Sequence, residues 1–188
     1  LKVRSHRKLP VGAEICEVEI IRKDHWYVYF SLNYDGGSVP VPENCPVGID
    51  LGIRTTIALS DATELNKPDY ESKTADRLAA HQRKLNGQVR GSKRYWKTKQ
   101  KIRAVHEKNT RRRDYWWHCV TKHLSDRYSE VFYEDLTLSF MNEGVIKSNR
   151  KKSYEIAFGK IKALLGYKMG KRARVVNPYN TSKMCCQC

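Results

Sequence analysis

The chain has 188 residues, of which 40% are hydrophobic, so it is long enough to bury the core of a domain. Its 36 Lys and Arg residues against 20 Asp and Glu give a formal net charge of +16, which is not typical of an enzyme of small neutral metabolites. Such an excess favours a polyanionic partner, with nucleic acid ahead of an anionic membrane surface. No apolar run approaches the roughly 20 residues that span a bilayer, and no signal peptide is visible.

The first expected elements are two strands over residues 13–33. Residues 14–20 alternate between polar and apolar side chains, and residues 25–32 are rich in aromatic and β-branched side chains. Gly and Pro residues then punctuate the segment 35–46. These punctuating residues predict a linker and a domain boundary near residue 45.

The next segment predicts the opening hairpin of a buried sheet, followed by helices. Two short apolar strands, 47–50 and 55–60, flank a turn that contains Gly52. Residues 72–128 then carry 17 Lys and Arg against 4 Asp and Glu, with apolar residues at helical spacing. This segment is expected to form a basic helical hairpin with one thin apolar stripe.

A strand, a helix and a last strand complete the expected order. Residues 131–136 are a strand that ends in acidic residues, and Ser153 is a candidate N-cap for a helix that stops at Gly170. Residues 174–177 are the last short strand. The order β-β-helices-β-α-β predicts an α/β fold.

Two carboxylates stand at the ends of short apolar strands, Asp50 and Glu134. If the two strands are neighbours, their carboxylates converge, and a cation is needed between them to keep both ionised. Mg²⁺ prefers such oxygen ligands, and a pair of Mg²⁺ ions can clamp a phosphodiester. In the plainer alternative, Asp50 caps a turn and Glu134 pairs with an arginine. Asp135, adjacent to Glu134, would point to the other face of the sheet.

The basic hairpin offers cations suited to nucleic-acid phosphates, interleaved with tryptophans. Charge of this kind binds the backbone without reading sequence, and exposed aromatic rings can stack on bases, although the tryptophans are more simply explained as core. The candidate nucleic-acid-binding residues are Lys93, Arg94, Lys97, Lys101, Arg103, Arg111, Arg112 and Arg113.

Three of the six cysteines lie in the last four residues, where Cys185 and Cys188 form a C-x-x-C pair. That spacing is typical of half a zinc ribbon, although a redox motif shares it. With no export signal, the cysteines indicate a reducing compartment.

Four blocks in order, "VGIDLGIRTTIALSD", "VFYEDLTLSFM", "FGKIKALLGYKMGKRARVVNPYNTS" and "CCQC", resemble the carboxyl-terminal half of TnpB-type transposon-encoded proteins and of the related miniature type V CRISPR nucleases. The resemblance implies a RuvC-like (RNase H-like) mixed sheet over residues 46–180, with the hairpin inserted at about 68–128. It also implies a β-rich wedge segment over residues 1–45 and a truncated zinc ribbon over residues 181–188.

The resemblance implies an RNA-guided DNA endonuclease of a prokaryotic cytoplasm, associated with the nucleoid, whose partners are guide RNA and target DNA. A homodimer is compatible with it, and no membrane association is expected. Asp50 and Glu134 match the first two acids that bind the two Mg²⁺ ions, and Cys185 and Cys188 match the first zinc pair. The family's third acid and second cysteine pair are not in this sequence, so this chain is expected to be inactive alone.

Two rival functions remain. A nuclease-inactive, RNA-guided DNA-binding repressor shares the fold, and loss of the third acid favours it, whereas retention of Asp50 and Glu134 argues against it. An ATPase of the actin and heat-shock class also begins with a "GIDLG" block, but Ile53 and Arg54 stand where those proteins have small hydroxyl residues.

Overall fold

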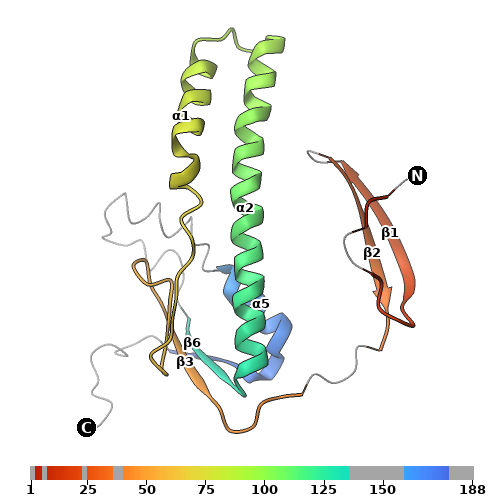
Figure 1. Ribbon diagram of the computed structural model, residues 1–188, viewed down its shortest axis with the longest axis vertical. Coiled ribbons are helices and arrows are strands. Elements are labelled where there is room, and N and C mark those ends of the chain that lie inside the picture. The colour runs from red at the N-terminus through yellow and green to blue at the C-terminus, as the bar shows by residue number, and fades with distance from the viewer. Residues whose placement is uncertain (1–2, 6–7, 23–24, 36–39, 136–158, 178–188) are drawn as a thin grey trace. The chain divides into compact units, whose positions relative to one another are not determined.

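A computed structural model describes the chain except for residues 1–2, 6–7, 23–24, 36–39, 136–158 and 178–188 (Figure 1). The chain divides into two compact units, Leu1–Pro40 and Val41–Cys188. Within the described residues, no helix combines the length and apolar character needed to cross a membrane.

The first unit is a two-stranded antiparallel hairpin. Strand β1 (Glu14–Arg22) pairs with strand β2 (Trp26–Asn33), which confirms the two strands expected over residues 13–33. Cross-strand apolar pairs such as Val18 with Phe30 and Ile20 with Val28 support the register. Because two strands cannot enclose a core, most of these side chains remain exposed.

The second unit contains a five-stranded mixed sheet in the order β5-β4-β3-β6-β7. The strands are β3 (Val47–Leu51), β4 (Ile57–Leu59), β5 (Glu64–Leu65), β6 (Val131–Glu134) and β7 (Ala173–Val176). Strands β3, β4 and β5 form an antiparallel meander, whereas β6 is parallel to β3 and β7 is parallel to β6. The sequence did not predict β5, because two residues carry too little periodicity to be recognised as a strand.

The core lies on one face of this sheet, under two helices. Alternate strand residues, including Val47, Ile49 and Val131, are buried because a strand directs successive side chains to opposite faces. They pack with apolar residues near the end of helix α2 (Lys93–Arg127) and from helix α5 (Gly159–Met169). Both helices appear beside β6 in Figure 1, and each runs between strands of the sheet, in the way that parallel strands require.

Helix α1 (Ser72–Asn86) and the first half of α2 form the predicted helical hairpin (Figure 1). Helix α2 begins after Ser92, whose hydroxyl accepts the backbone N–H of Tyr95 at 3.1 Å. The helices are joined by one buried side-chain bond, in which Asn109 Nδ2 donates to Thr74 Oγ1 at 2.8 Å. Thr74 is the only buried residue of α1, and the apolar Leu78 and Leu85 are half-buried, in keeping with the thin apolar stripe expected.

The end of α5 follows the expected glycine stop. Gly170 has a φ of +55°, a left-handed conformation that favours glycine and ends the helix. A short 3₁₀ turn, η1 (Gly170–Arg172), then leads into β7. The helix start predicted at Ser153 lies outside the described residues.

One polar tie connects the meander to the end of α2. The hydroxyl of Tyr128 donates to Asp61 Oδ2 at 2.6 Å, and the backbone N–H of Thr63 donates to Asp61 Oδ1 at 2.9 Å. The Tyr128 bond, followed by the Thr63 bond, lowers the pKa of Asp61 from 3.8 to about 2. Burial, followed by the bond to Asp61, raises the pKa of Tyr128 from 10.0 to about 12.

These two shifts predict a pH window for the stabilising effect of the tie. The ionised carboxylate of Asp61 adds its full contribution to the free energy of unfolding above its unfolded pKa of 3.8. This contribution is lost as the pH falls towards 2. The protonated hydroxyl of Tyr128 adds its full contribution to the free energy of unfolding below its unfolded pKa of 10.0. This contribution is lost as the pH rises towards 12. We therefore expect the free energy of unfolding lost in Tyr128→Phe to be largest at neutral pH and smaller at both extremes, as measured by urea unfolding. The exposed Tyr167→Phe is the control, and a loss that does not vary with pH would contradict the assignment.

Candidate functional site

Asp50 and Glu134 lie at the same level on neighbouring parallel strands. Strand β3 pairs with β6 in the register Ile49↔Tyr133, so the next residue along each strand is Asp50 on one and Glu134 on the other. Neighbouring strands lie about 4.8 Å apart. The two acids are therefore adjacent at the carboxyl ends of β3 and β6, where α/β sheets commonly place their sites.

Both acids lie on the face of the sheet opposite the helices. Ile49 and Tyr133 are buried in the core, so Asp50 and Glu134 are directed to the other face. Asp50 is exposed and Glu134 is half-buried. The β4 residue beside Asp50 is Ala58, whose small side chain leaves room at the carboxylate.

The neighbouring acid, Asp135, lies differently. Its carboxylate forms an ion pair with Lys162 of α5, on the face where the helices pack. Within the described part of the chain, Glu134 has no cationic partner, and Arg174 pairs with Glu130 instead, at 2.8 Å. The alternative in which an arginine neutralises Glu134 therefore has no support among these residues.

The donor chemistry of this pair fits a hard cation. Carboxylate oxygens are the protein ligands that Mg²⁺ prefers, and Mg²⁺ commonly takes one or two of them together with water and phosphate oxygens. No group of three or more His, Cys, Asp or Glu side chains with metal-binding geometry occurs within the described residues. Asp50 and Glu134 are therefore the described residues that could hold such a cation at this end of the sheet.

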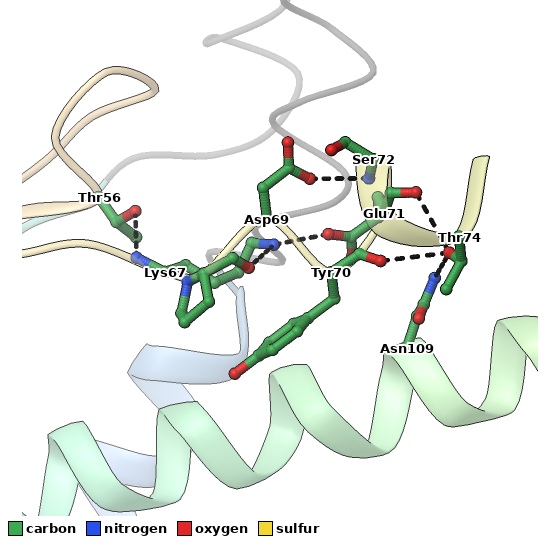
Figure 2. Close-up of polar contacts among 9 residues, drawn as sticks. Thr56, Lys67, Asp69, Tyr70, Glu71, Ser72, Thr74 and Asn109 are labelled. Atoms are coloured by element: carbon green, nitrogen blue, oxygen red, sulfur yellow. Dashed lines mark hydrogen bonds and ion pairs between the residues drawn. The ribbon is translucent and has the colours of Figure 1, made fainter. Parts of the chain in front are cut away.

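Sequence reasoning missed a polar strap, residues 66–71, between the sheet and the helical hairpin. The strap is fixed at the turn after β3, where Asn66 Oδ1 accepts the backbone N–H of Thr56 and Thr56 Oγ1 accepts that of Lys67, both at 3.0 Å. Figure 2 shows Lys67 reaching Glu71, with an Nζ–Oε2 distance of 2.7 Å. The i,i+4 spacing of that pair was the available signal.

The same strap reaches both helices of the hairpin. Glu71 precedes α1, and Thr74 Oγ1 lies within hydrogen-bonding distance of the carbonyl groups of Tyr70 and Glu71, at 3.2 and 3.1 Å (Figure 2). The guanidinium of Arg112, on α2, lies 5.6 Å from the centre of the Tyr70 ring. The side chains of Lys67 and Glu71 are only 7% and 18% exposed, so the pair is largely withdrawn from water. Removing one partner would leave the other as an unpaired, largely buried charge.

The predicted basic residues of α2 fall into two classes. Lys93, Arg94, Lys97 and Lys101 are exposed and have no described partner. The remaining four differ: Arg103 pairs with Glu107 at 2.7 Å, Arg112 lies on Tyr70, Arg111 is exposed and Arg113 is half-buried. A rise of 1.5 Å per residue separates Lys93 from Arg113 by about 30 Å, so the eight residues are not one cluster.

The tryptophans of α2 divide between core and surface. Trp117 is fully buried and Trp116 packs edge-on against it, with ring centres 4.7 Å apart, as the core explanation expects. Trp96 is 52% exposed, and Lys99 Nζ lies 5.0 Å from the centre of its ring. Only Trp96 among these three is therefore positioned to meet a ligand from solvent.

The cysteine pair Cys185 and Cys188 lies outside the described residues. The three cysteines that are described, Cys16, Cys45 and Cys119, are exposed free thiols.

Two curated relatives match the chain by sequence. The chain is 29% identical over 197 aligned positions to a putative RNA-guided DNA endonuclease of Streptomyces pristinaespiralis, covering 100% of this chain and 48% of the relative. It is 28% identical over 180 positions to the putative RNA-guided DNA endonuclease InsQ of Escherichia coli (strain K12), covering 87% and 44%. The chain thus spans about half the length of these relatives.

A solved structure supports the mixed α/β fold. A chain of the Cas12f1–sgRNA–target DNA complex, determined by cryo-electron microscopy, matches this chain with a TM-score of 0.59 and 19% sequence identity. The match covers 94% of this chain and 38% of that one.

The family model for OrfB_IS605, described as a probable transposase, matches residues 22–143, more than half of the sequence. The chain therefore belongs to this TnpB-type family of probable transposases.

Proposed function

We propose that this chain is the carboxylate-bearing nuclease part of an RNA-guided DNA endonuclease. The observation that carries the proposal is the placement of Asp50 and Glu134 at one level and on one face of neighbouring parallel strands. The endonuclease names of the two curated relatives support the proposal. The strong positive charge supports a nucleic-acid substrate.

The proposed fold is an RNase H-like, RuvC-like sheet. A five-stranded mixed sheet with β3 at its centre supports this assignment, as does the similarity to the Cas12f1 chain. In the proposed reaction one water is consumed: its oxygen bonds to phosphorus, one P–O ester bond breaks, and the leaving oxygen gains a proton. Asp50 and Glu134 would hold Mg²⁺, which when bound supplies Lewis-acid stabilisation of the charge on the phosphate.

The proposed partners are a guide RNA and a target DNA. The exposed cations of α2 support backbone contact with the guide–target duplex, and Trp96 is suited to stacking on an unpaired base. Residues 1–45, which include the first unit, would belong to a β-rich wedge that contacts RNA. Cys185 and Cys188 would supply two ligands to a zinc ion.

A guide-programmed cleavage assay tests this function. The full-length protein, loaded with its guide RNA, should cut a DNA target that matches the guide and leave a scrambled target intact. Cleavage should stop when EDTA removes Mg²⁺ and should resume when Mg²⁺ is restored, because the two carboxylates require a cation to act together.

The alternatives give different results in the same assay. Guide-dependent DNA binding without cleavage in Mg²⁺ would favour the repressor. ATP hydrolysis without nucleic-acid binding would favour the ATPase. Cleavage that ignores the guide would leave the nuclease chemistry but contradict RNA guidance.

A further inference from the structure

The turn that follows β3 brings its own backbone close to Gly52. Residues 52–56 connect β3 to β4, and the backbone N–H of Gly52 donates to the carbonyl oxygen of Thr56 at 3.3 Å. A Cβ atom at Gly52 would lie 2.7 Å from the carbonyl oxygen of Thr55, which is closer than real Cβ contacts. The turn therefore requires glycine at its start. Because the turn follows β3, it lies at the carboxyl end of that strand, the same end of the sheet at which Asp50 and Glu134 lie.

Hydrogen bonds to residues outside the turn also hold it in place. Thr55 Oγ1 donates to Glu64 Oε2 at 3.4 Å, and the strap described above holds Thr56 through its backbone N–H and its hydroxyl. Figure 2 shows the bond to the hydroxyl, from the backbone N–H of Lys67. Thr56 is only 4% exposed. The backbone of this turn is therefore already ordered before a ligand binds. Less conformational entropy is then lost when a side chain of the turn contacts the ligand.

Arg54 is at the tip of this braced turn. It is exposed, and within the described residues it has no hydrogen-bond or ion-pair partner. Glu64, an acid on β5 of the meander, accepts from Thr55. Some described cations are paired, including Lys67 with Glu71 and Arg174 with Glu130, whereas the guanidinium of Arg54 is left available to a ligand.

We infer that Arg54 contacts the phosphate group on which Asp50 and Glu134 act. This inference rests on the proposed nuclease function and adds a residue to it. Two carboxylates repel a phosphodiester, whereas a guanidinium presents paired N–H donors that match two phosphate oxygens. Such a donor stabilises the charge that grows on those oxygens as the water attacks, so Arg54 acts most strongly in the transition state.

The test compares Arg54 variants of the full-length, guide-loaded protein under single-turnover conditions. Arg54→Ala should lower the cleavage rate by about 10²-fold at saturating DNA, with a much smaller loss of DNA affinity and an unchanged thermal midpoint. Arg54→Lys should recover part of the rate because it restores one charge without the fork. Lys171→Ala removes an exposed charge just before the amino end of β7, at the end of the sheet opposite to the two carboxylates. This variant should cleave like the wild type.

Wild-type cleavage by Arg54→Ala would overturn the inference while leaving the nuclease function intact. If the wild-type protein does not cut, the nuclease proposal fails, and a second measurement still decides the role of Arg54. The Arg54 Nε–H resonance, identified by its loss in Arg54→Lys, should shift when single-stranded DNA is added in Ca²⁺. A resonance that does not move would overturn the phosphate contact.

Discussion

Asp50→Ala should abolish DNA cleavage in the full-length, guide-loaded protein while leaving guide RNA binding unchanged. The exposed carboxylate of Asp50 makes no described contact that supports the fold, so its loss should remove cation binding and little else. Losing several kcal/mol of transition-state stabilisation corresponds to a rate lower by about three orders of magnitude or more. Single-turnover cleavage and filter binding of labelled RNA measure the two effects.

A neighbouring pair of substitutions gives this prediction a matched control. Glu134→Gln and Asp135→Asn each replace one carboxylate with an amide of similar size, at adjacent positions of the chain. Glu134 is expected to share the cation with Asp50, whereas Asp135 pairs with Lys162 on the other face. Glu134→Gln should therefore be inactive, and Asp135→Asn should cut at close to the wild-type rate. The reverse pattern would move the site to the helix face and would exclude the pairing of Asp50 with Glu134.

Removing two lysines from the exposed face of α2 should weaken nucleic-acid binding in a salt-dependent way. Lys97 and Lys101 lie one turn apart, and neither has a described partner. Each phosphate contact contributes about 0.9 to the slope of log K against log salt for a duplex. The double variant Lys97→Gln/Lys101→Gln should therefore lower that slope by about 1.8. Fluorescence anisotropy with an RNA–DNA duplex of about 20 base pairs measures it.

A second double variant removes the same charge elsewhere. Lys122 and Lys171 are exposed, and Lys122 makes only a surface ion pair with Asp126, at 2.6 Å. An exposed pair of this kind contributes little to stability. Lys122→Gln/Lys171→Gln should keep most of the wild-type slope. Equal loss in both variants would indicate a response to net charge alone and would contradict backbone contact along α2.

Local sequence patterns predicted most of the elements of this chain. The alternation in 14–20, the helical spacing and charge of 72–128, and the glycine at position 170 each depend on near neighbours, and the corresponding elements are present. The two elements that the sequence did not predict also have physical explanations. Strand β5 is too short to show a period, and the strap from Asn66 to Glu71 contacts Thr56 and Arg112, which its own sequence does not specify.

The sequence by itself determined which residues could act: the carboxylates at two strand ends, the surplus of cations in one hairpin, and the glycine that the turn after Asp50 requires. Only the tertiary structure decided that β3 and β6 are neighbours and parallel, in a register that puts Asp50 beside Glu134. It also showed that Asp135, unlike Glu134, pairs with a lysine of α5, and that Arg103, unlike Lys97, forms an ion pair. The reason is that pairing between distant strands depends on the packing of helices across the sheet, which no local period encodes.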